Sequence, residues 1–381
     1  MVFYLQILLF KLLIMAVEKI NIEIFLELSK QYPVIDVRSP GEFNHAQIPE
    51  AYSLPLFTDQ ERKIVGTIYK QQSRETAIKI GLDFFGVKMK QMVEDVEQIV
   101  SSLEPHTYSK EELVPPPPEG VRGKPLLIHC WRGGMRSGAV AWLLDMYGFK
   151  VYTLEGGYKL FRKWVLEQFD KKYNLKILGG YTGSGKTLML GELQNKGNNV
   201  IDLEGLANHK GSAFGGIGEK NQPSQEMFEN LLALQLQANT NPDKNSRPIW
   251  LEDESQRIGK LIIPNPFWEM MRESPVYFLD IPFKERLDFL VNTYGNFEKE
   301  KLEDAIGRIK KRLGGLEAKN AINFLSENNI RECFRILLHY YDKLYAKGLI
   351  NRKNYESLLN IIPCQGVTSS VNINKLSLQR V

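Results

Sequence analysis

Cysteine is scarce in this chain, which has 381 residues and only three thiols, Cys130, Cys333 and Cys364. Three thiols without paired spacings exclude a small secreted protein held by a disulfide framework and favour a reducing, cytoplasmic location. A large excess of one charge is also missing, because 49 Lys and Arg against 45 Asp and Glu leave a net charge of +4. That mild excess permits nucleic acid binding without establishing it.

A long uninterrupted apolar run is missing from the N-terminus as well. Residues 1–16 are apolar, but Gln6 and Lys11 interrupt them. The stretch is short for a membrane span, and no basic residue precedes it as in a signal peptide. We therefore expect a misassigned start, with Met15 as the first residue, and no membrane association. An amphipathic anchor is the alternative.

Apolar strands alternate with charged helices, which predicts an α/β fold with parallel sheets. The length allows two domains, a parallel-sheet domain over residues 17–172 and a second α/β domain over residues 173–381 with a helical C-terminal part. Strands are expected at residues 33–38, 125–129, 151–154, 175–178, 199–203, 247–251 and 275–281. Helices are expected at residues 20–28, 59–104, 138–147, 161–169, 187–195 and from 284 onward, with a turn at 39–41 and a stiff four-proline loop at 115–118.

The first candidate site is the loop HCWRGGMRS at residues 129–137, between a predicted strand and a predicted helix. Backbone N–H groups and the helix start can converge there on the Cys130 sulfur, while Arg132 and Arg136 add positive charge. These features lower the pKa of a thiol, so we predict a catalytic nucleophile with the two arginines as partners. A buried structural cysteine is the alternative.

The spacing of this loop also has a second interpretation. Cys-x5-Arg followed by Ser is the signature of cysteine-dependent phosphatases. However, residues 36–43 and 45–51 resemble the opening of rhodanese (sulfurtransferase) domains, and residues 155–158 resemble their closing turn. Common rhodanese loops have one residue fewer between Cys and Arg, so the longer loop suggests a larger, phosphate-bearing donor.

The second candidate site is GYTGSGKT at residues 180–187, which matches the phosphate-binding loop between a strand and a helix. Backbone N–H groups of such a loop hold phosphate oxygens, the lysine neutralises charge, and the threonine hydroxyl can bind Mg²⁺. The expected phosphate-binding residues are Gly180, Gly183, Gly185, Lys186, Thr187 and Asp253.

Two further segments are expected near the phosphates. Residues 202–215 hold too many glycines and polar groups for a core element, so we predict a loop that lines the site, with His209 and Ser212 toward the substrate. A structural role is the alternative for His209. Asp253 follows a predicted strand and is expected to bind Mg²⁺ together with Thr187, and a solvated acidic turn is its alternative.

Together these segments resemble one family, the bacterial and archaeal tRNA 2-selenouridine synthases, from about Asp36 to Tyr345. The shared segments are GTIYKQQ at 66–72, the Cys130 loop, EGGYK at 155–159, the phosphate loop, residues 202–215 and LEDES at 251–255. The resemblance implies a rhodanese-like domain fused to a P-loop domain. It also implies replacement of sulfur by selenium in wobble-position 2-thiouridine, with selenophosphate as donor.

The family also transfers a geranyl group from geranyl diphosphate to the thio-sulfur, which makes that sulfur a better leaving group. On this resemblance Cys130 is the nucleophile that carries or guides selenium, and the phosphate loop grips the diphosphate of the prenyl donor. No tightly bound cofactor is expected, selenophosphate and geranyl diphosphate are substrates, and Mg²⁺ is a candidate ion at the phosphate loop. The implied partners are tRNA and an enzyme that supplies selenophosphate. A basic stripe on a predicted helix is expected to bind tRNA phosphates. It comprises Arg308, Lys310, Lys311 and Arg312. A solvated helix face is the alternative.

Two other functions stay open from the residues alone. A cysteine phosphatase fused to a kinase-like domain would hydrolyse a small phosphomonoester in a reaction that depends on Cys130. A non-catalytic adaptor would only bind ligands in both loops, and rapid alkylation of Cys130 at mildly acidic pH would count against it.

Overall fold

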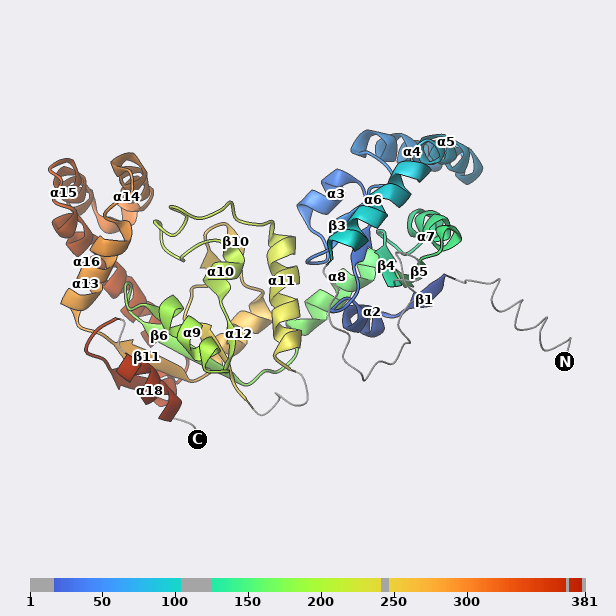
Figure 1. The fold of residues 1–381 in the computed structure, drawn as a ribbon. Coiled ribbons are helices and arrows are strands. Elements are labelled where there is room, and N and C mark those ends of the chain that lie inside the picture. The colour runs from blue at the N-terminus through green and yellow to red at the C-terminus, as the bar shows by residue number, and fades with distance from the viewer. Residues whose placement is uncertain (1–16, 104–124, 241–246, 368–369, 379–381) are drawn as a thin grey trace, which may run out of the picture. The chain divides into compact units, whose positions relative to one another are not determined.

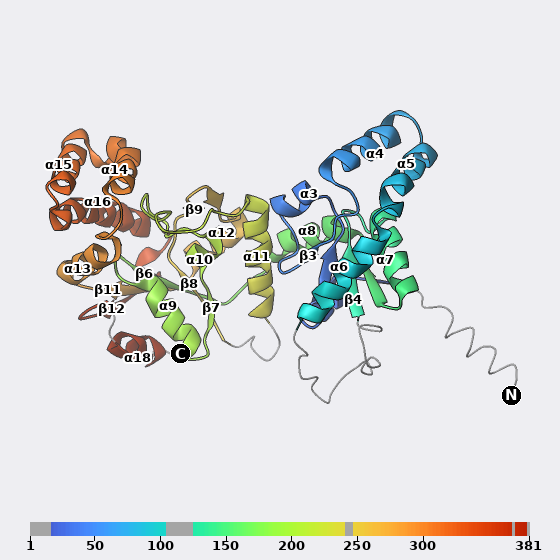
Figure 2. The same cartoon turned by 45° about the horizontal axis from the view of Figure 1, so that its top comes forward.

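The computed structural model describes residues 17–103, 125–240, 247–367 and 370–378 (Figures 1 and 2). It divides the chain into two compact units, Met1–Val165 and Leu166–Val381. Each unit contains a five-stranded sheet whose neighbouring strands run parallel, which confirms the predicted α/β class. The expected start at Met15 and the four-proline loop lie outside the described residues.

The first unit has the strand order β1-β5-β4-β2-β3, with β4 in the middle of the sheet. Its strands are β1 (Glu18–Ile20), β2 (Val34–Asp36), β3 (Tyr52–Ser53), β4 (Pro125–His129) and β5 (Lys150–Leu154). Its helices are α2 (Ile22–Leu28), α3 (Pro40–His45), α4 (Asp59–Gln71), α5 (Arg74–Gly86), α6 (Met89–Ser102), α7 (Met135–Tyr147) and α8 (Gly157–Gln168), and the last of these runs across the division between the units.

The central strand β4 is buried on both faces. Leu126 and Ile128 share a core with side chains of α6 and α7. On the other face the His129 ring lies against Phe25 of α2 and Tyr158 of α8. Two covered faces explain why this strand is a continuous apolar run. The residue that follows it, Cys130, therefore lies at the carboxyl edge of the sheet, where open α/β sheets bind their ligands.

The second unit has the strand order β12-β11-β6-β8-β7, with β6 in the middle. Its strands are β6 (Leu175–Gly180), β7 (Asn199–Ile201), β8 (Ile249–Glu252), β11 (Val276–Asp280) and β12 (Leu359–Pro363), and β9 (Arg257–Ile258) with β10 (Leu261–Ile262) forms a separate antiparallel hairpin. Its helices are α9 (Lys186–Asn195), α10 (Leu203–Ala207), α11 (Gln225–Ala238), α12 (Asn265–Glu273), α13 (Phe283–Tyr294), α14 (Lys299–Leu313), α15 (Gly315–Ser326), α16 (Ile330–Ile350), α17 (Tyr355–Leu358) and α18 (Ser370–Leu378).

Two apolar cores stabilise the second unit. The first joins the sheet to α9 and α18 through side chains that include Leu178, Leu190 and Ile373. The second is mainly helical, and packs α13, α14, α15 and α16 around residues such as Ala305 and Phe334, with Phe214 and Ile217 of the loop after α10 added to it. Figure 1 shows these four helices gathered at one end of the unit. The helical core fixes the positions of α13, α14 and α16, which all border the site described below.

Two predictions for the first unit are wrong in their boundaries. The helix expected at residues 20–28 begins only after Asn21, whose side chain accepts a hydrogen bond from the first turn, and β1 precedes it. The turn expected at residues 39–41 is the first turn of α3, where Ser39 and Glu42 form a capping box. The prediction that residues 59–104 are helical is confirmed over the described part of this range, which forms three helices, α4, α5 and α6.

Two predictions for the second unit need a similar correction. The C-terminal region, predicted as helical from residue 284, contains β12, which pairs with β11. Its apolar run is short and lacks alternation, so periodicity does not separate it from a helix. The segment 202–215 begins with α10, capped by the Asp202 side chain, and only the rest of it is the predicted loop.

Candidate functional site

The Cys130 thiol lies in the loop that connects β4 with α7. Its side chain is 3% exposed, and its sulfur lies 3.3 Å from the Ser137 Oγ in the first turn of α7. The same hydroxyl donates a hydrogen bond of 3.1 Å to the Gly134 carbonyl oxygen. The thiol is therefore held in a closed loop with a hydroxyl group directly beside the sulfur.

This loop lowers the pKa of the Cys130 thiol. Burial alone would raise the pKa, but hydrogen bonds from the Ser137 hydroxyl and from the backbone N–H groups of Ser137, Arg132 and Gly134 stabilise the thiolate more strongly. Cys333, which is buried without such donors, shows the opposite effect, and burial raises its pKa to about 12. The predicted convergence of loop amides on one sulfur is therefore present in the structure, and it distinguishes Cys130 from the other thiols.

The residues EGGYK at 155–159 pack against the thiol loop and bind its backbone. The backbone N–H of Tyr158 donates to the Cys130 carbonyl oxygen at 2.8 Å, and that of Lys159 donates to the Trp131 carbonyl oxygen at 2.9 Å. Gly157 has a φ of 60°, and a Cβ there would lie 2.4 Å from the Cys130 oxygen. Only glycine fits this contact, so the motif acts by shaping the loop.

Arg132 and Arg136 are placed differently from each other. Arg132 is exposed, whereas Arg136 donates to Glu42 at 2.7 Å and 3.4 Å. Arg62 contacts the same carboxylate at 2.9 Å. Although burial opposes it, the hydrogen bond and charge of Arg136 lower the pKa of Glu42 to about 2, with help from Ser39 N–H and Arg62. The Arg136 charge is thus engaged with Glu42, a partner that the sequence motif alone does not reveal.

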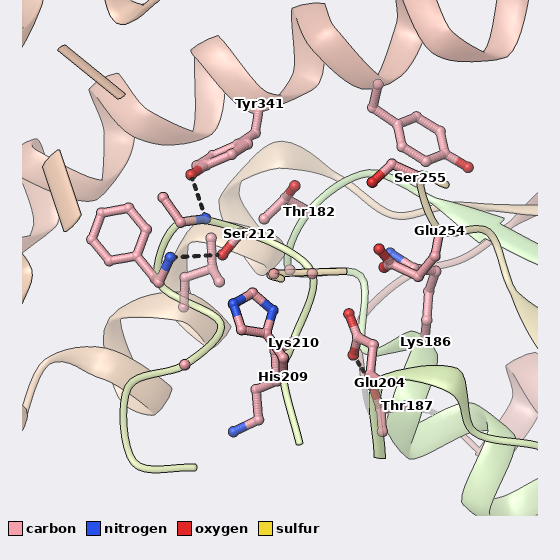
Figure 3. A pocket seen from close by; sticks show the side chains of 18 of the residues that line it. Thr182, Lys186, Thr187, Glu204, His209, Lys210, Ser212, Glu254, Ser255 and Tyr341 are labelled. Carbon is pink, nitrogen blue, oxygen red and sulfur yellow. Dashed lines mark hydrogen bonds between the residues drawn. The ribbon is translucent and has the colours of Figure 1, made fainter. Parts of the chain in front are cut away.

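The phosphate loop of the second unit connects β6 with α9. Its glycines Gly180, Gly183 and Gly185 have φ values of 151°, 78° and 71°, which a residue with a Cβ rarely adopts. The Lys186 ammonium donates to the Gly180 carbonyl oxygen at 3.2 Å. The Thr187 hydroxyl donates to Glu204 Oε2 at 3.1 Å (Figure 3). The loop thus has the expected conformation, and its lysine and threonine are held by neighbouring oxygens.

Asp253, which was predicted to bind Mg²⁺, is hydrogen-bonded to protein side chains in the structure. Its Oδ2 accepts a hydrogen bond of 2.7 Å from the Tyr345 hydroxyl, and its Oδ1 is paired with Arg352. The Tyr345 oxygen in turn accepts a hydrogen bond of 3.1 Å from the Gly180 N–H. Both carboxylate oxygens are therefore occupied by protein donors, and Asp253 supports the start of the phosphate loop through Tyr345. Among the described residues no three His, Cys, Asp or Glu side chains are arranged to hold a metal ion.

Three glutamates that the sequence interpretation missed lie beside the phosphate loop. Glu252 ends β8 and is buried, and its Oε1 accepts a hydrogen bond of 2.7 Å from Glu204 N–H. Burial first, and then the charges of Asp202 and Glu204, raise the pKa of Glu252 well above its usual range. Burial and the charge of Glu204 likewise raise the pKa of Glu254, although Lys186 opposes the shift. Figure 3 shows Glu204, Glu254 and Lys186 grouped together.

The predicted substrate loop lines the same site. His209 is half-buried, its Nδ1 has no hydrogen-bond partner among the described residues, and burial lowers the pKa of its imidazole. The Ser212 hydroxyl accepts a hydrogen bond of 3.2 Å from Phe214 N–H, while the Tyr341 hydroxyl accepts one of 3.3 Å from Ala213 N–H. A neutral imidazole and an ordered hydroxyl therefore face the phosphate loop (Figure 3).

Lys186, Thr187, Glu204, His209 and Glu254 border one cavity of about 1410 Å³ in the second unit. Its polar side consists of the phosphate loop, the segment around His209 and the residues that follow β8. Its other side is apolar and comes from α13, α14 and α16, and comprises Phe289, Leu290, Tyr294, Ile309, Phe334, Leu337, Leu338, Tyr341 and Leu344. The cavity therefore offers anion-binding groups and a hydrocarbon-like wall to the same ligand.

Only part of the basic stripe on α14 lines this cavity. All four of its side chains are exposed, but only Arg308 and Arg312, which are one turn apart, line the cavity. Arg308 donates to the Ala213 carbonyl oxygen at 2.8 Å. Lys310 and Lys311 are exposed elsewhere on the helix. The stripe therefore wraps around the helix, as its crowded spacing predicts.

Comparison with known proteins matches both units. The model of the rhodanese-like domain matches residues 22–163, and that of the tRNA 2-selenouridine synthase AAA domain matches residues 173–360. The tRNA 2-selenouridine synthase of Hydrogenovibrio crunogenus is 35% identical over 347 residues, or 83% of this chain and 89% of the relative. That of Shewanella pealeana is 35% identical over 350 residues, covering 84% and 89%, and that of Nitrosomonas europaea is 31% identical over 369 residues, covering 84% and 90%.

A rhodanese-like domain whose loop lowers the pKa of a thiol, followed by a phosphate-loop domain with an amphipathic cavity, is the architecture of a two-domain group-transfer enzyme. The relatives make the assignment specific: the chain belongs to the tRNA 2-selenouridine synthase family. The resemblance drawn from the sequence motifs is thereby confirmed. Within the described residues, no helix combines the length and apolar character needed to cross a membrane.

Proposed function

We propose that this chain converts wobble-position 2-thiouridine in tRNA to 2-selenouridine, with selenophosphate as the selenium donor. We propose further that the reaction passes through an S-geranyl intermediate. In the first step the thio-sulfur attacks the first carbon of geranyl diphosphate, so that a carbon–sulfur bond forms, the carbon–oxygen bond breaks and diphosphate leaves. The geranylated sulfur is then a better leaving group for replacement by selenium.

The observation that carries this proposal is the cavity of the second unit. Its phosphate loop suits a diphosphate, because loop N–H groups and Lys186 bind anionic oxygens. The apolar wall from α13, α14 and α16 suits a branched hydrocarbon chain, because burial of that chain against Leu337, Phe334 and their neighbours removes apolar surface from water. A prenyl diphosphate has both parts in one molecule. A nucleotide would leave the apolar wall without a matching group.

The thiol loop of the first unit supports the selenium step. Loop N–H groups and the Ser137 hydroxyl lower the pKa of Cys130, so a larger fraction of this thiol is nucleophilic at neutral pH. In this proposal Cys130 is the nucleophile that carries or guides selenium, and the exposed Arg132 is its cationic neighbour toward the phosphate-bearing donor. Arg136 takes part only when the donor replaces Glu42 as its anionic partner. The exposed cations of α14 contact tRNA phosphates.

The test uses the purified full chain, a tRNA that carries wobble 2-thiouridine, and nucleoside mass analysis. With geranyl diphosphate alone we expect S-geranyl-2-thiouridine, and with selenophosphate added we expect 2-selenouridine. Lys186→Ala should reduce the first product, whereas Cys130→Ser should reduce only the second. Full selenation in the absence of geranyl diphosphate would overturn the proposed intermediate.

A further inference from the structure

We infer that the mouth of the cavity is a tRNA-binding surface with two sides, the β9–β10 hairpin facing the cavity from one side and α14 from the other. This inference rests on the proposed function, because it names the part of the chain that delivers the anticodon loop to the phosphate-loop cavity. Five exposed cations form this surface and are called the rim cations below. They are Lys220, Arg257, Lys260, Arg308 and Arg312.

The charge of the cavity lining is strongly unbalanced. Eight Lys and Arg side chains line it against four Asp and Glu side chains, in a chain whose total charges nearly cancel. Among the acids, Glu219 is paired with Lys210 at 2.8 Å, and Asp253 is paired with Arg352. A diphosphate on the phosphate loop needs only Lys186 and the loop N–H groups. The rim cations therefore exceed what a small donor requires, and such an excess at a cavity mouth attracts a polyanion.

The hairpin side of the mouth is held rigidly by hydrogen bonds. At its tip, Lys260 N–H donates to Gln222 Oε1 at 2.7 Å, and Gln222 Nε2 donates to the Ile258 and Ala207 carbonyl oxygens at 3.0 Å and 3.1 Å. Gln225 at the start of α11 makes two further bonds, to the backbone N–H and oxygen of Ile262. Two glutamine side chains thus fix a six-residue hairpin, Arg257–Ile262, whose own ladder is very short.

Two cationic side chains of the hairpin, together with Lys220 from the segment before α11, are free for a partner. Lys220, Arg257 and Lys260 are exposed, and none of them makes an ion pair or a side-chain hydrogen bond with another described residue. The bonds that hold the hairpin use only its backbone, so its arginine and lysine do not support the fold. A rigid backbone that presents unpaired cations is suited to bind phosphates at low entropic cost.

The opposite side of the mouth is α14. Arg312 is exposed and unpaired among the described residues, and Arg308 bonds only to a backbone oxygen. Figures 1 and 2 draw the hairpin and α14 apart in both views, while side chains of both line the one cavity. Tyr340, which is half-buried in the lining, supplies a ring on which an unstacked base can lie. Cations on two sides and an aromatic ring in the same lining fit a single-stranded RNA loop.

The test measures binding of the full chain to a tRNA with wobble 2-thiouridine, at several salt concentrations and without geranyl diphosphate or selenophosphate. Arg257→Gln with Lys260→Gln removes two hairpin cations. We expect the slope of log K against log salt to fall by about 1.4–1.8, so the loss of affinity is about 7–12-fold larger at about 50 mM than at about 200 mM salt. Arg312→Gln tests the opposite side separately and should lower the slope by about 0.7–0.9.

The matched control is Lys319→Gln with Lys353→Gln, two exposed cations of the same unit that do not line the cavity. This control removes the same amount of charge as the hairpin variant. An equal loss of tRNA affinity would show that the net charge of the chain matters and not the position of the rim cations, and it would overturn the inference. Unchanged tRNA binding by both rim variants would also overturn it. If the hairpin variant raised only the KM for geranyl diphosphate, its cations would belong to the donor site and not to tRNA. Failure of the unsubstituted chain to transfer geranyl at all would refute the proposed function instead, and the binding measurement would still be interpretable.

Discussion

Ser137→Ala should raise the pKa of the Cys130 thiol by about one unit. The Ser137 hydroxyl lies 3.3 Å from the sulfur and 3.1 Å from the Gly134 carbonyl oxygen, and it has one hydrogen to donate. Beside a thiol, the hydroxyl donates to Gly134 and accepts from the S–H. Beside a thiolate, it turns to the sulfur and loses the bond to Gly134.

The size of the shift follows from this exchange. A hydrogen bond to a charged group contributes about 1.5–3 kcal/mol, and the lost neutral bond subtracts about 0.5–1.5 kcal/mol. The difference of about 1–1.5 kcal/mol corresponds to about one pKa unit. Because the backbone N–H groups stay in place, the thiol of the variant should remain more acidic than it would be without them.

The assay is the rate of alkylation of the thiol between about pH 5 and about pH 9, followed by mass spectrometry. The other thiols stay silent, because burial raises the pKa of Cys333 to about 12 and that of Cys364 to about 11. Ser137→Thr keeps a hydroxyl and is the matched control, with an expected profile close to that of the unsubstituted chain. An alanine variant with an unshifted profile would refute the role of the hydroxyl and leave the loop amides as the whole cause.

Three other substitutions test the two loops. Lys186→Ala should raise the KM for geranyl diphosphate by on the order of 10–150-fold, because a bond to a charged group is lost, and unchanged kinetics would assign another ligand to the loop. Tyr345→Phe leaves a buried N–H of the phosphate loop without its acceptor, so it should destabilise the chain by about 1–3 kcal/mol and weaken donor binding, whereas an unchanged unfolding midpoint would contradict the supporting role. Cys130→Ser should abolish selenation while tRNA affinity stays the same, and full selenation by this variant would remove the cysteine from the reaction.

The sequence predicts those parts of the fold in which local and long-range signals agree. Strand β4 was predicted with its observed bounds, because a strand buried on both faces is an apolar run with polar ends. Strand β12 was missed, since the five residues Leu359–Pro363 become a strand only through pairing with β11. Pairing between segments distant in the chain is a tertiary property, and neither composition nor periodicity encodes it.

The same distinction applies to the candidate sites. The conformations of the Cys130 loop and the phosphate loop could be predicted because glycines and a fixed spacing specify their local backbone shape. The partners of Asp253 were not predicted, since Tyr345 and Arg352 come from 92 and 99 positions further along the chain. Glu42 was missed for the same reason, because it meets Arg136 from 94 positions away.

We expect ligand binding to be coupled to protonation of Glu254, which lies with Glu204 and Lys186 in the cavity lining. The pKa of Glu254 is raised by burial and by Glu204, and Lys186 partly opposes that rise. An incoming diphosphate draws Lys186 toward itself and adds negative charge, so both effects raise the pKa further and the site should take up a proton. Binding should then strengthen as pH falls, and calorimetry in buffers of different ionisation enthalpy would count the proton. A cation that accompanies the diphosphate would lower the pKa of the same carboxyl and release a proton instead. Proton uptake or proton release on binding therefore reports whether the diphosphate binds without or with a cation.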